Sequence, residues 1–172
     1  MGKDSLIFVT IGTHEQPFNR LIQEVHGLVE SGLIKEKVFI QRGIKSIIPR
    51  NCESAELIPY QEMVEKIKNA RIVITHGGPS SILQSLTFGK TPIVVPRQSR
   101  FREHVDDHQV HFTKRLEAQK KVIAVYDIEI LLEKIEHYEE ICNELGIPKI
   151  SPNGINQLIE NLDFYCASVK LI

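Results

Sequence analysis

The chain has 172 residues, of which 42% are hydrophobic and 25% are charged, and its formal net charge is −1. This length fits one domain, and the hydrophobic fraction is that of a folded protein, which excludes a largely disordered chain. A net charge near zero argues against bulk electrostatic binding of nucleic acid.

Two kinds of apolar segment alternate along the chain. Short runs rich in branched residues predict buried strands, which lie at residues 6–11, 38–40, 55–58, 72–75, 92–95 and 122–125. Apolar residues at helical spacing predict helices between the strands, at residues 17–29, 61–70, 80–88, 103–116 and 127–145. Asp127 and Gly146 are suited to cap the last of these, and Ser151-Pro152 opens a further helix.

Strands that alternate with helices require a parallel sheet with helices on both faces. We therefore predict one α/β domain with a Rossmann-like parallel sheet over residues 1–172, with its core at 6–145 and a C-terminal helical extension at 151–172. Ligands of such folds bind at the carboxyl ends of the strands. The loops after Ile11, Thr75 and Val95 are therefore the candidate site.

The cellular compartment is indicated by what the sequence does not contain. Cys52, Cys142 and Cys166 form no C-x-x-C pair, so we expect small apolar side chains in a reducing compartment and no disulfide framework. The longest stretch without charged residues, Ile72 to Gly89, is interrupted by His76 and Pro79 and is not a spanning helix. We expect a cytoplasmic protein without a signal peptide.

The first two loops have features of an anion site. In the loop Gly12-Thr13-His14-Glu15-Gln16-Pro17, Gly12 permits a sharp turn, and the helix that follows points free N–H groups towards the crevice. An ordinary strand–helix turn is the alternative. In Thr75-His76-Gly77-Gly78-Pro79-Ser80-Ser81, two glycines permit close approach of a ligand to the backbone, and Pro79 favours the start of a helix. Gln84 follows one turn later.

The third loop, residues 96–109, is basic and rich in histidine. Arg97, Arg100 and Arg102 predict a local positive patch for a pyrophosphate, an acidic partner or anionic lipid, with a solvated loop as the alternative. His104, His108 and His111 are spaced to share one helical face, which makes zinc a candidate. No H-E-x-x-H motif and no cysteine set accompany them, and we expect no metal.

Taken together, the loops resemble a known family. Residues 76–81 resemble the nucleotide-sugar loop in the C-terminal half of GT-B glycosyltransferases, residues 89–96 the G-x-P-x-x-x-x-P strand after it, and His108-Gln109 its downstream H-Q pair. The chain is thus similar to the glycosyltransferase family 28 C-terminal domain. The opening segment, residues 8–18, resembles the soluble catalytic subunits of split, two-chain members, of the capsular and exopolysaccharide galactosyltransferase type or the eukaryotic dolichol-linked N-acetylglucosaminyltransferase type.

The resemblance implies roles for particular residues. Gly12, Thr13 and His14 would border the diphosphate, and the turn at Ile58-Pro59-Tyr60 would face the uracil. The ribose and phosphates would be held by the loop residues His76, Gly77, Gly78, Pro79, Ser80 and Ser81, with Arg97 among the arginines that stabilise the departing UDP. His108 and Gln109 would reach the donor sugar. Gln84 departs from the glutamate that many members place at this position, so the charge-assisted part of a ribose contact is missing.

The implied reaction is an inverting transfer of a hexose (galactose or N-acetylglucosamine) from a UDP-sugar to a polyprenyl-diphosphate-linked saccharide. It would require no metal cofactor, and His14 or Glu15 would act as the general base unless the partner chain supplies one. Implied partners are a membrane-associated acceptor-binding subunit and the lipid-linked acceptor, without nucleic acid, and the chain would lie at the inner face of the membrane. The alternatives are a non-catalytic accessory subunit that stabilises a membrane glycosyltransferase and a small zinc hydrolase that uses the three histidines.

Overall fold

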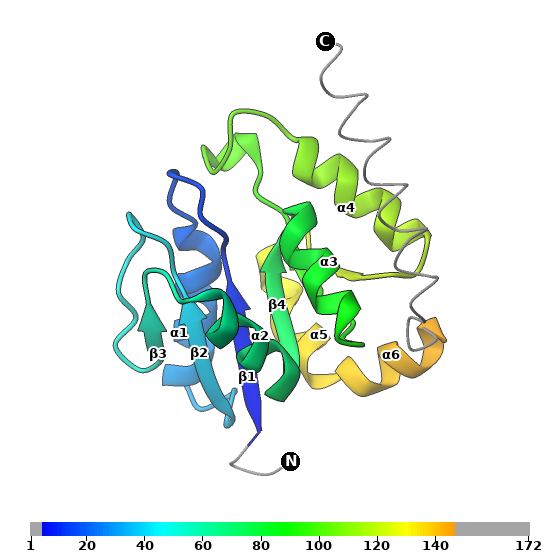
Figure 1. Cartoon of the computed structure of the whole chain (residues 1–172), viewed down its shortest axis with the longest axis horizontal. Coiled ribbons are helices and arrows are strands. Elements are labelled where there is room, and N and C mark those ends of the chain that lie inside the picture. The colour runs from blue at the N-terminus through cyan, green and yellow to red at the C-terminus, as the bar shows by residue number, and fades with distance from the viewer. Residues whose placement is uncertain (1–4, 147–172) are drawn as a thin grey trace.

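Six parallel strands form one sheet at the centre of the computed structural model, which describes residues 5–146 (Figure 1). The strands are β1 (Leu6–Thr10), β2 (Lys37–Gln41), β3 (Glu53–Ala55), β4 (Ala70–His76), β5 (Ile93–Val95) and β6 (Ile123–Ala124). Their order in the sheet is β3-β2-β1-β4-β5-β6, and every neighbouring pair is parallel. The predicted parallel α/β sheet is confirmed. The predicted helix at 151–172 and Cys166 lie outside the described residues.

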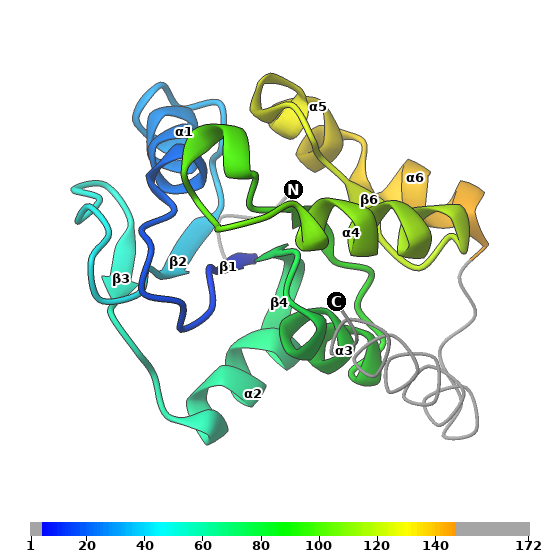
Figure 2. The ribbon, with the colours of Figure 1, turned by 90° about the horizontal axis from the view of Figure 1, so that it is seen from above.

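Helices cover both faces of the sheet. They are α1 (Asn19–Glu30), α2 (Tyr60–Asn69), α3 (Pro79–Thr87), α4 (His108–Ala118), α5 (Leu131–Glu136) and α6 (Tyr138–Leu145), with 3-10 helices η1 (Ser99–Phe101) and η2 (Ile128–Ile130). Figure 2 shows α1 and α5 on one side of the sheet and α2 and α3 on the other. Within the described residues, no helix is long and apolar enough to cross a membrane.

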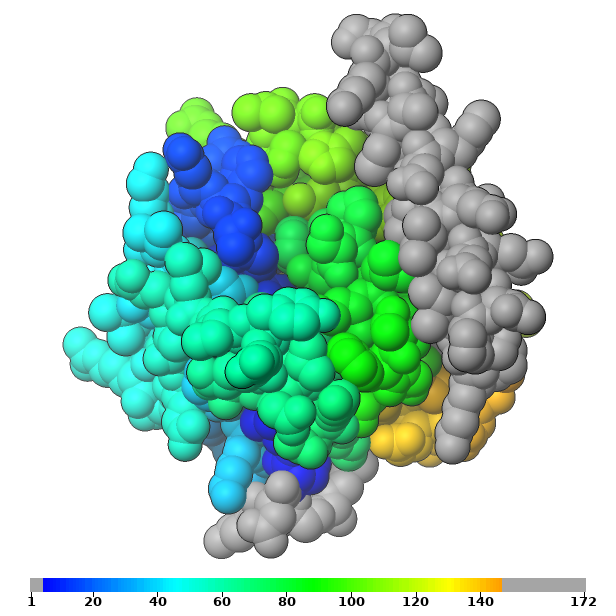
Figure 3. Space-filling view, viewed as in Figure 1, coloured from blue at the N-terminus to red at the C-terminus, as the bar shows by residue number. Residues whose placement is uncertain are grey.

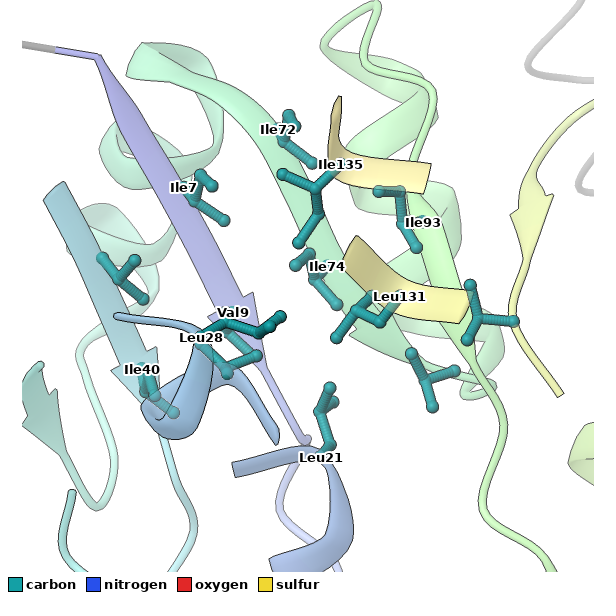
Figure 4. Packing of buried hydrophobic residues seen from close by; sticks show 14 of the residues in the cluster. Ile7, Val9, Leu21, Leu28, Ile40, Ile72, Ile74, Ile93, Leu131 and Ile135 are labelled. Atoms are coloured by element: carbon teal, nitrogen blue, oxygen red, sulfur yellow. The ribbon is translucent and has the colours of Figure 1, made fainter. Parts of the chain in front are cut away.

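Side chains of each strand alternate between the two faces of the sheet, and this produces one apolar cluster on each face. Ile72 and Ile74 of β4 face the cluster that includes Leu21 of α1 and Leu131 of α5 (Figure 4). Val73 of the same strand points to the opposite face, into a cluster with side chains of α2. Because side chains of a strand alternate between faces, a strand that is buried on both sides must be apolar at every position. This is why these strands read as continuous apolar runs.

Most element boundaries lie within two residues of the sequence prediction, and three elements differ from it in ways that have a clear physical reason. The third strand is Glu53–Ala55 rather than 55–58, because Glu53 pairs with Phe39 in the register of β2 and the chain leaves the sheet before Leu57. The long helix predicted at 127–145 is broken at His137, where the backbone leaves helical geometry. At the start of this segment Asp127 does act as a cap, because its side chain accepts the amide of Glu129 at 3.5 Å. At its end Gly146 stops α6 with a φ of +58°.

The third difference lies in the candidate site. Helix α4 begins at His108, five residues later than predicted. Glu103 turns inward, where it accepts the amide of Gln98 at 3.1 Å, and Asp107 accepts the amide of Ser99 at 2.8 Å. These two contacts fold residues 98–107 into a compact loop instead of a first helical turn.

The sheet order places the candidate loops at a topological switch point. From β1 the chain winds outwards through β2 to β3, and it then returns to β4 on the other side of β1. In open parallel sheets the crevice between two strands whose connections diverge in this way is the usual ligand site. Here that crevice lies between the loop after β1 and the loop after β4.

Candidate functional site

A cleft follows the carboxyl edge of the sheet at this switch point. Its deepest part is a cavity of about 280 Å³, lined by Thr10, Gly12 and Thr13 after β1 and by His76, Gly78 and Ser81 after β4, among others. A more open cavity of about 780 Å³, the wide end of the cleft, adjoins it through Thr13 and His76. Another cavity of about 570 Å³, at the opposite end of the cleft, adjoins it through Ile58 and Ser80. In Figure 3 the cleft lies between the blue N-terminal loop and the green surface of α3. Most residues that the resemblance implies therefore meet in one continuous groove.

The start of α3 offers free backbone amides to this groove. The first helical hydrogen bond runs from the amide of Ile82 to the carbonyl of Gly78 at 3.2 Å. The amides of Ser80 and Ser81 precede it and have no acceptor within the helix. Gly78, the N-cap residue, has no side chain that could cap them, and Pro79 at the first position contributes no N–H. Such an uncapped helix end attracts a negatively charged group.

The glycines around this groove make room for a histidine of the chain itself. A Cβ atom at Gly12 would lie 2.5 Å from Cε1 of His76, and a Cβ atom at Gly78 would overlap the same ring. Gly12 also has a φ of +74°, which a side chain would strain. Burial, followed by the charge of Arg97, lowers the pKa of His76 to about 3. A neutral imidazole is thus held between the two loops.

Gln109 joins three parts of the site. Its amide oxygen accepts the backbone amides of Gly77 and of Arg97, both at 3.1 Å. A Cβ atom at Gly77 would lie 2.8 Å from the Cβ atom of Gln109, so this glycine permits close packing against α4. Both contacts use the oxygen, which leaves the amide nitrogen as the group that Gln109 can offer to a ligand in the wide cavity.

The interpretation of Arg97 as part of an exposed positive patch is wrong. Its side chain is 0% exposed, and its guanidinium donates to the carbonyls of Ile11 at 3.0 Å and Gln16 at 2.8 Å. It also donates to the carbonyls of Pro17 and Glu103. Burial lowers the pKa of Arg97 to about 10, so the group stays charged at neutral pH. Arg97 therefore anchors the loop after β1 and does not line any of the three cavities described above.

The other two arginines of that loop, Arg100 and Arg102, are exposed. Their neighbour Glu103 is buried and receives two hydrogen bonds from Arg20, at 2.8 and 2.9 Å. Sequence reasoning missed this pair, which ties α1 to the loop after β5. An acidic residue among arginines gave no local signal, because its partner lies 83 positions earlier.

Gln41 is a second residue that sequence reasoning missed. Its amide nitrogen donates to the carbonyls of Gly12 and Glu56, both at 3.0 Å, and its oxygen accepts the hydroxyl of Thr10 at 2.6 Å. Thr10 and Gln41 are register partners at the carboxyl ends of β1 and β2. Thr10 and Gln41 both line the deep cavity. The feature of the sequence that could have indicated Gln41 is its place as a polar residue at the end of an apolar strand.

Histidines gather at the wide end of the cleft. The rings of His14 and His104 lie 4.7 Å apart between centroids, and those of His104 and His108 lie 4.4 Å apart. Burial, followed by the charges of His108 and His14, lowers the pKa of His104. The predicted helical face of His104, His108 and His111 is wrong, because His104 precedes α4. Glu15 stands at the rim with a side chain that is 88% exposed.

The opposite end of the cleft is more apolar. Ile58, Met63, Leu83 and Phe88 line it, together with Tyr60 and Gln84. Tyr60 opens α2 and is 73% exposed. A flat, partly apolar group fits this end better than a charged one does.

The comparison with known families decides the relationship. Residues 6–144 match the glycosyltransferase family 28 C-terminal domain. The chain belongs to this family.

Two relatives illustrate the range of the family. The chain is 29% identical over 133 residues to a UDP-N-acetylglucosamine--N-acetylmuramyl-(pentapeptide) pyrophosphoryl-undecaprenol N-acetylglucosamine transferase of Rickettsia bellii, a match that covers 77% of this chain and 35% of that protein. It is 26% identical over 133 residues to the UDP-N-acetylglucosamine transferase subunit ALG13 of Yarrowia lipolytica, covering 71% of this chain and 65% of that protein. The chain thus spans less than two thirds of the length of either relative.

Solved structures show the same fold in larger glycosyltransferases. MurG of Acinetobacter baumannii superposes with a TM-score of 0.61 at 16% identity, over 95% of this chain and 51% of that one. The calicheamicin glycosyltransferase CalG4 superposes with a TM-score of 0.58 at 15% identity, over 96% of this chain and 44% of that one. The predicted correspondence to the C-terminal half of a GT-B fold is confirmed.

Proposed function

We propose that this chain is the donor-binding catalytic subunit of a two-chain inverting glycosyltransferase. It takes a hexose, galactose or N-acetylglucosamine, from a UDP-sugar and transfers it to a polyprenyl-diphosphate-linked saccharide in the synthesis of a surface polysaccharide. The observation that carries the proposal is the uncapped start of α3, with the amides of Ser80 and Ser81, in the floor of a cleft at the switch point. The family membership and the activities for which the relatives are named support it.

The three parts of the cleft suit the three parts of a UDP-sugar. The apolar end with Tyr60 and Gln84 takes the uridine, and Gln84 offers the ribose a neutral amide. The deep cavity takes the diphosphate, with Thr13 on one side and the start of α3 on the other. The wide end then receives the sugar beside His108 and Gln109.

Transfer requires a nucleophile, a leaving group and a base. The acceptor hydroxyl attacks the anomeric carbon from the face opposite UDP, the bond from that carbon to the phosphate oxygen breaks, and UDP leaves with the bonding electrons. The proton of the hydroxyl passes to His14 or Glu15, which stand at the wide end of the cleft. The partial positive charge at the start of α3 stabilises the departing diphosphate without a metal.

The acceptor side comes from a second chain. The fungal relative is itself named a subunit of a transferase. We therefore propose a membrane-associated partner that binds the lipid-linked saccharide and brings this chain to the inner face of the membrane. Its surface would close the wide end of the cleft over the sugar.

The test is the thermal stability of the chain against UDP, GDP, CMP and a panel of UDP-sugars. A ligand at about 100 times its dissociation constant adds roughly 2.7 kcal/mol, and we expect this for uridine nucleotides alone. Ser80→Ala and Ser81→Ala leave the helix amides in place and should reduce the shift only modestly. Ser31→Ala, at the far end of α1, is the matched control and should leave it unchanged.

A non-catalytic accessory subunit is the second candidate, because the fungal relative is named a subunit of a transferase. Such a chain would stabilise its partner without binding a nucleotide sugar. Absence of a shift both for the chain alone and for the co-expressed pair would favour this function and contradict the first.

A further inference from the structure

A cluster of potential metal ligands lies in the loop that enters α4. His104, Asp106 and His108 are spaced H-x-D-x-H, and one ligand atom from each lies within 4.8 Å of the others. Oδ1 of Asp106 lies 3.2 Å from Nδ1 of His104, and the same oxygen contacts Nδ1 of His108. We propose that these three residues bind a divalent transition metal ion of the zinc class.

The donor set favours zinc over magnesium or calcium. Zinc takes imidazole nitrogen and carboxylate oxygen at about 2.0–2.2 Å in tetrahedral geometry, which sets neighbouring ligand atoms roughly 3.3 Å apart. The separation between the Asp106 oxygen and the His104 nitrogen, 3.2 Å, is already of this size. All three ligand atoms lie within 4.8 Å of one another, so small rotations of the side chains would bring the whole set to this spacing. Two imidazoles with one carboxylate are a poor set for the hard ions, which prefer oxygen ligands.

The loop is held on both sides of the cluster. Before it, Glu103 is fixed by two hydrogen bonds from Arg20. After it, Asp107 accepts the amide of Ser99 at 2.8 Å and its hydroxyl at 2.9 Å, and His108 is the first residue of α4. Ligands that are positioned before the ion arrives lose less conformational freedom when they bind it.

The site is open to solvent and incomplete in the manner of an exchangeable site. The side chain of His104 is 10% exposed, that of Asp106 59% and that of His108 34%, so an ion can enter from the Asp106 side. Three protein ligands leave the fourth tetrahedral position for water. The ring of His14 lies beside His104, so an ion here would sit at the mouth of the wide cavity. The inference does not depend on glycosyl transfer.

The experiment measures metal binding by the full chain without a polyhistidine tag. Protein stripped with a chelator is titrated with Zn²⁺ by calorimetry, its bound metal is counted after dialysis, and Co²⁺ is added as a visible-absorption probe of tetrahedral coordination. We expect one bound Zn²⁺ per chain, a Co²⁺ spectrum of the tetrahedral type and no response to Mg²⁺.

Variants assign the site. Asp106→Asn retains the size and hydrogen-bonding oxygen of an exposed side chain and should weaken Zn²⁺ binding by at least about tenfold. His104→Asn should do the same. His111→Asn removes an exposed histidine of α4 that lies outside the cluster, and it should bind like the unaltered chain. Equal binding by the unaltered chain and Asp106→Asn, or no bound zinc in the unaltered chain, would overturn the proposal. Unchanged thermal unfolding of metal-free Asp106→Asn shows that the variant is folded.

Discussion

The contact between Gly78 and His76 makes a sharp prediction about stability. Gly78 has φ and ψ of −77° and 129°, a conformation that alanine adopts without strain. Gly78→Ala would nevertheless place its Cβ atom 2.9 Å from both Cδ2 and Cε1 of His76 and closer still to Nε2. The ring has little room to move, because His76 is buried and a Cβ atom at Gly12 would also lie only 2.5 Å from its Cε1 atom.

The expected magnitude follows from two opposing effects. Overpacking a rigid site costs roughly 1–3 kcal/mol, and the close contact puts Gly78→Ala at the upper end, about 2–3 kcal/mol. In a His76→Ala background the ring is gone and the space is open. Gly78→Ala should then be neutral or stabilise the protein by up to about 1 kcal/mol, because alanine lowers the conformational entropy of the unfolded chain. The coupling free energy between the two positions should therefore be about 2–4 kcal/mol.

Urea unfolding of the four proteins in this double-mutant cycle is the assay. Gly27→Ala is the matched control, because Gly27 lies within α1 with nothing near its Cβ position. That change should stabilise by roughly 0.5–1 kcal/mol in both backgrounds. A cost of Gly78→Ala that is the same with and without His76, or no cost at all, would refute the reasoning that the glycine exists to admit the ring.

Three further predictions concern the same loops. Arg97→Met leaves four carbonyls without their donor, those of Ile11 and Glu103 in buried positions, and should lower the free energy of unfolding by about 3–5 kcal/mol in urea. Because the pKa of His76 falls from its ordinary 6.5 to about 3 on folding, the unfolded chain binds the extra proton. Stability should thus fall as pH decreases from about 6.5 towards 3, by up to roughly 1.4 kcal/mol per pH unit, and His76→Ala should flatten this profile. His14→Ala or Glu15→Ala should reduce turnover of the reconstituted pair by about 10²–10⁴-fold while the UDP-induced stability shift persists; full turnover in both variants would place the base in the partner.

Much of the fold was predictable because it is encoded locally. Continuous apolar runs identify β1, β4 and β5, and the cap at Asp127 and the stop at Gly146 use one residue each. Parallel strands then force the loops after β1, β4 and β5 to one edge, so the location of the cleft followed without any knowledge of contacts. The short edge strand β3 was misplaced, because it is only partly buried and Leu57 and Ile58 nearby are more apolar than the strand itself.

The roles of single polar residues were much less predictable. Arg97, Arg100 and Arg102 look alike in the sequence, yet Arg97 alone turns inward, towards carbonyls about 80 positions earlier. Similarly, α4 begins five residues later than predicted, and as a result Asp106, and not His111, lies beside His104 and His108. Such outcomes depend on long-range hydrogen bonds, which hydrophobic periodicity does not report.

Under the proposed function, the glycine-rich loop therefore acts on the ligand indirectly. Gly78 makes room for His76 and Gly77 for Gln109, and these side chains hold the loops after β1, β4 and β5 in one arrangement. The backbone amides at the start of α3 face the deep cavity, where they suit a phosphate but cannot distinguish one sugar from another. Under the proposed function, discrimination between hexoses must then come from side chains at the wide end, such as His14, Glu15 and His108. Because this end also carries the proposed metal ligands and faces the proposed partner, substitutions there should change which UDP-sugar is used before they change the affinity for UDP itself.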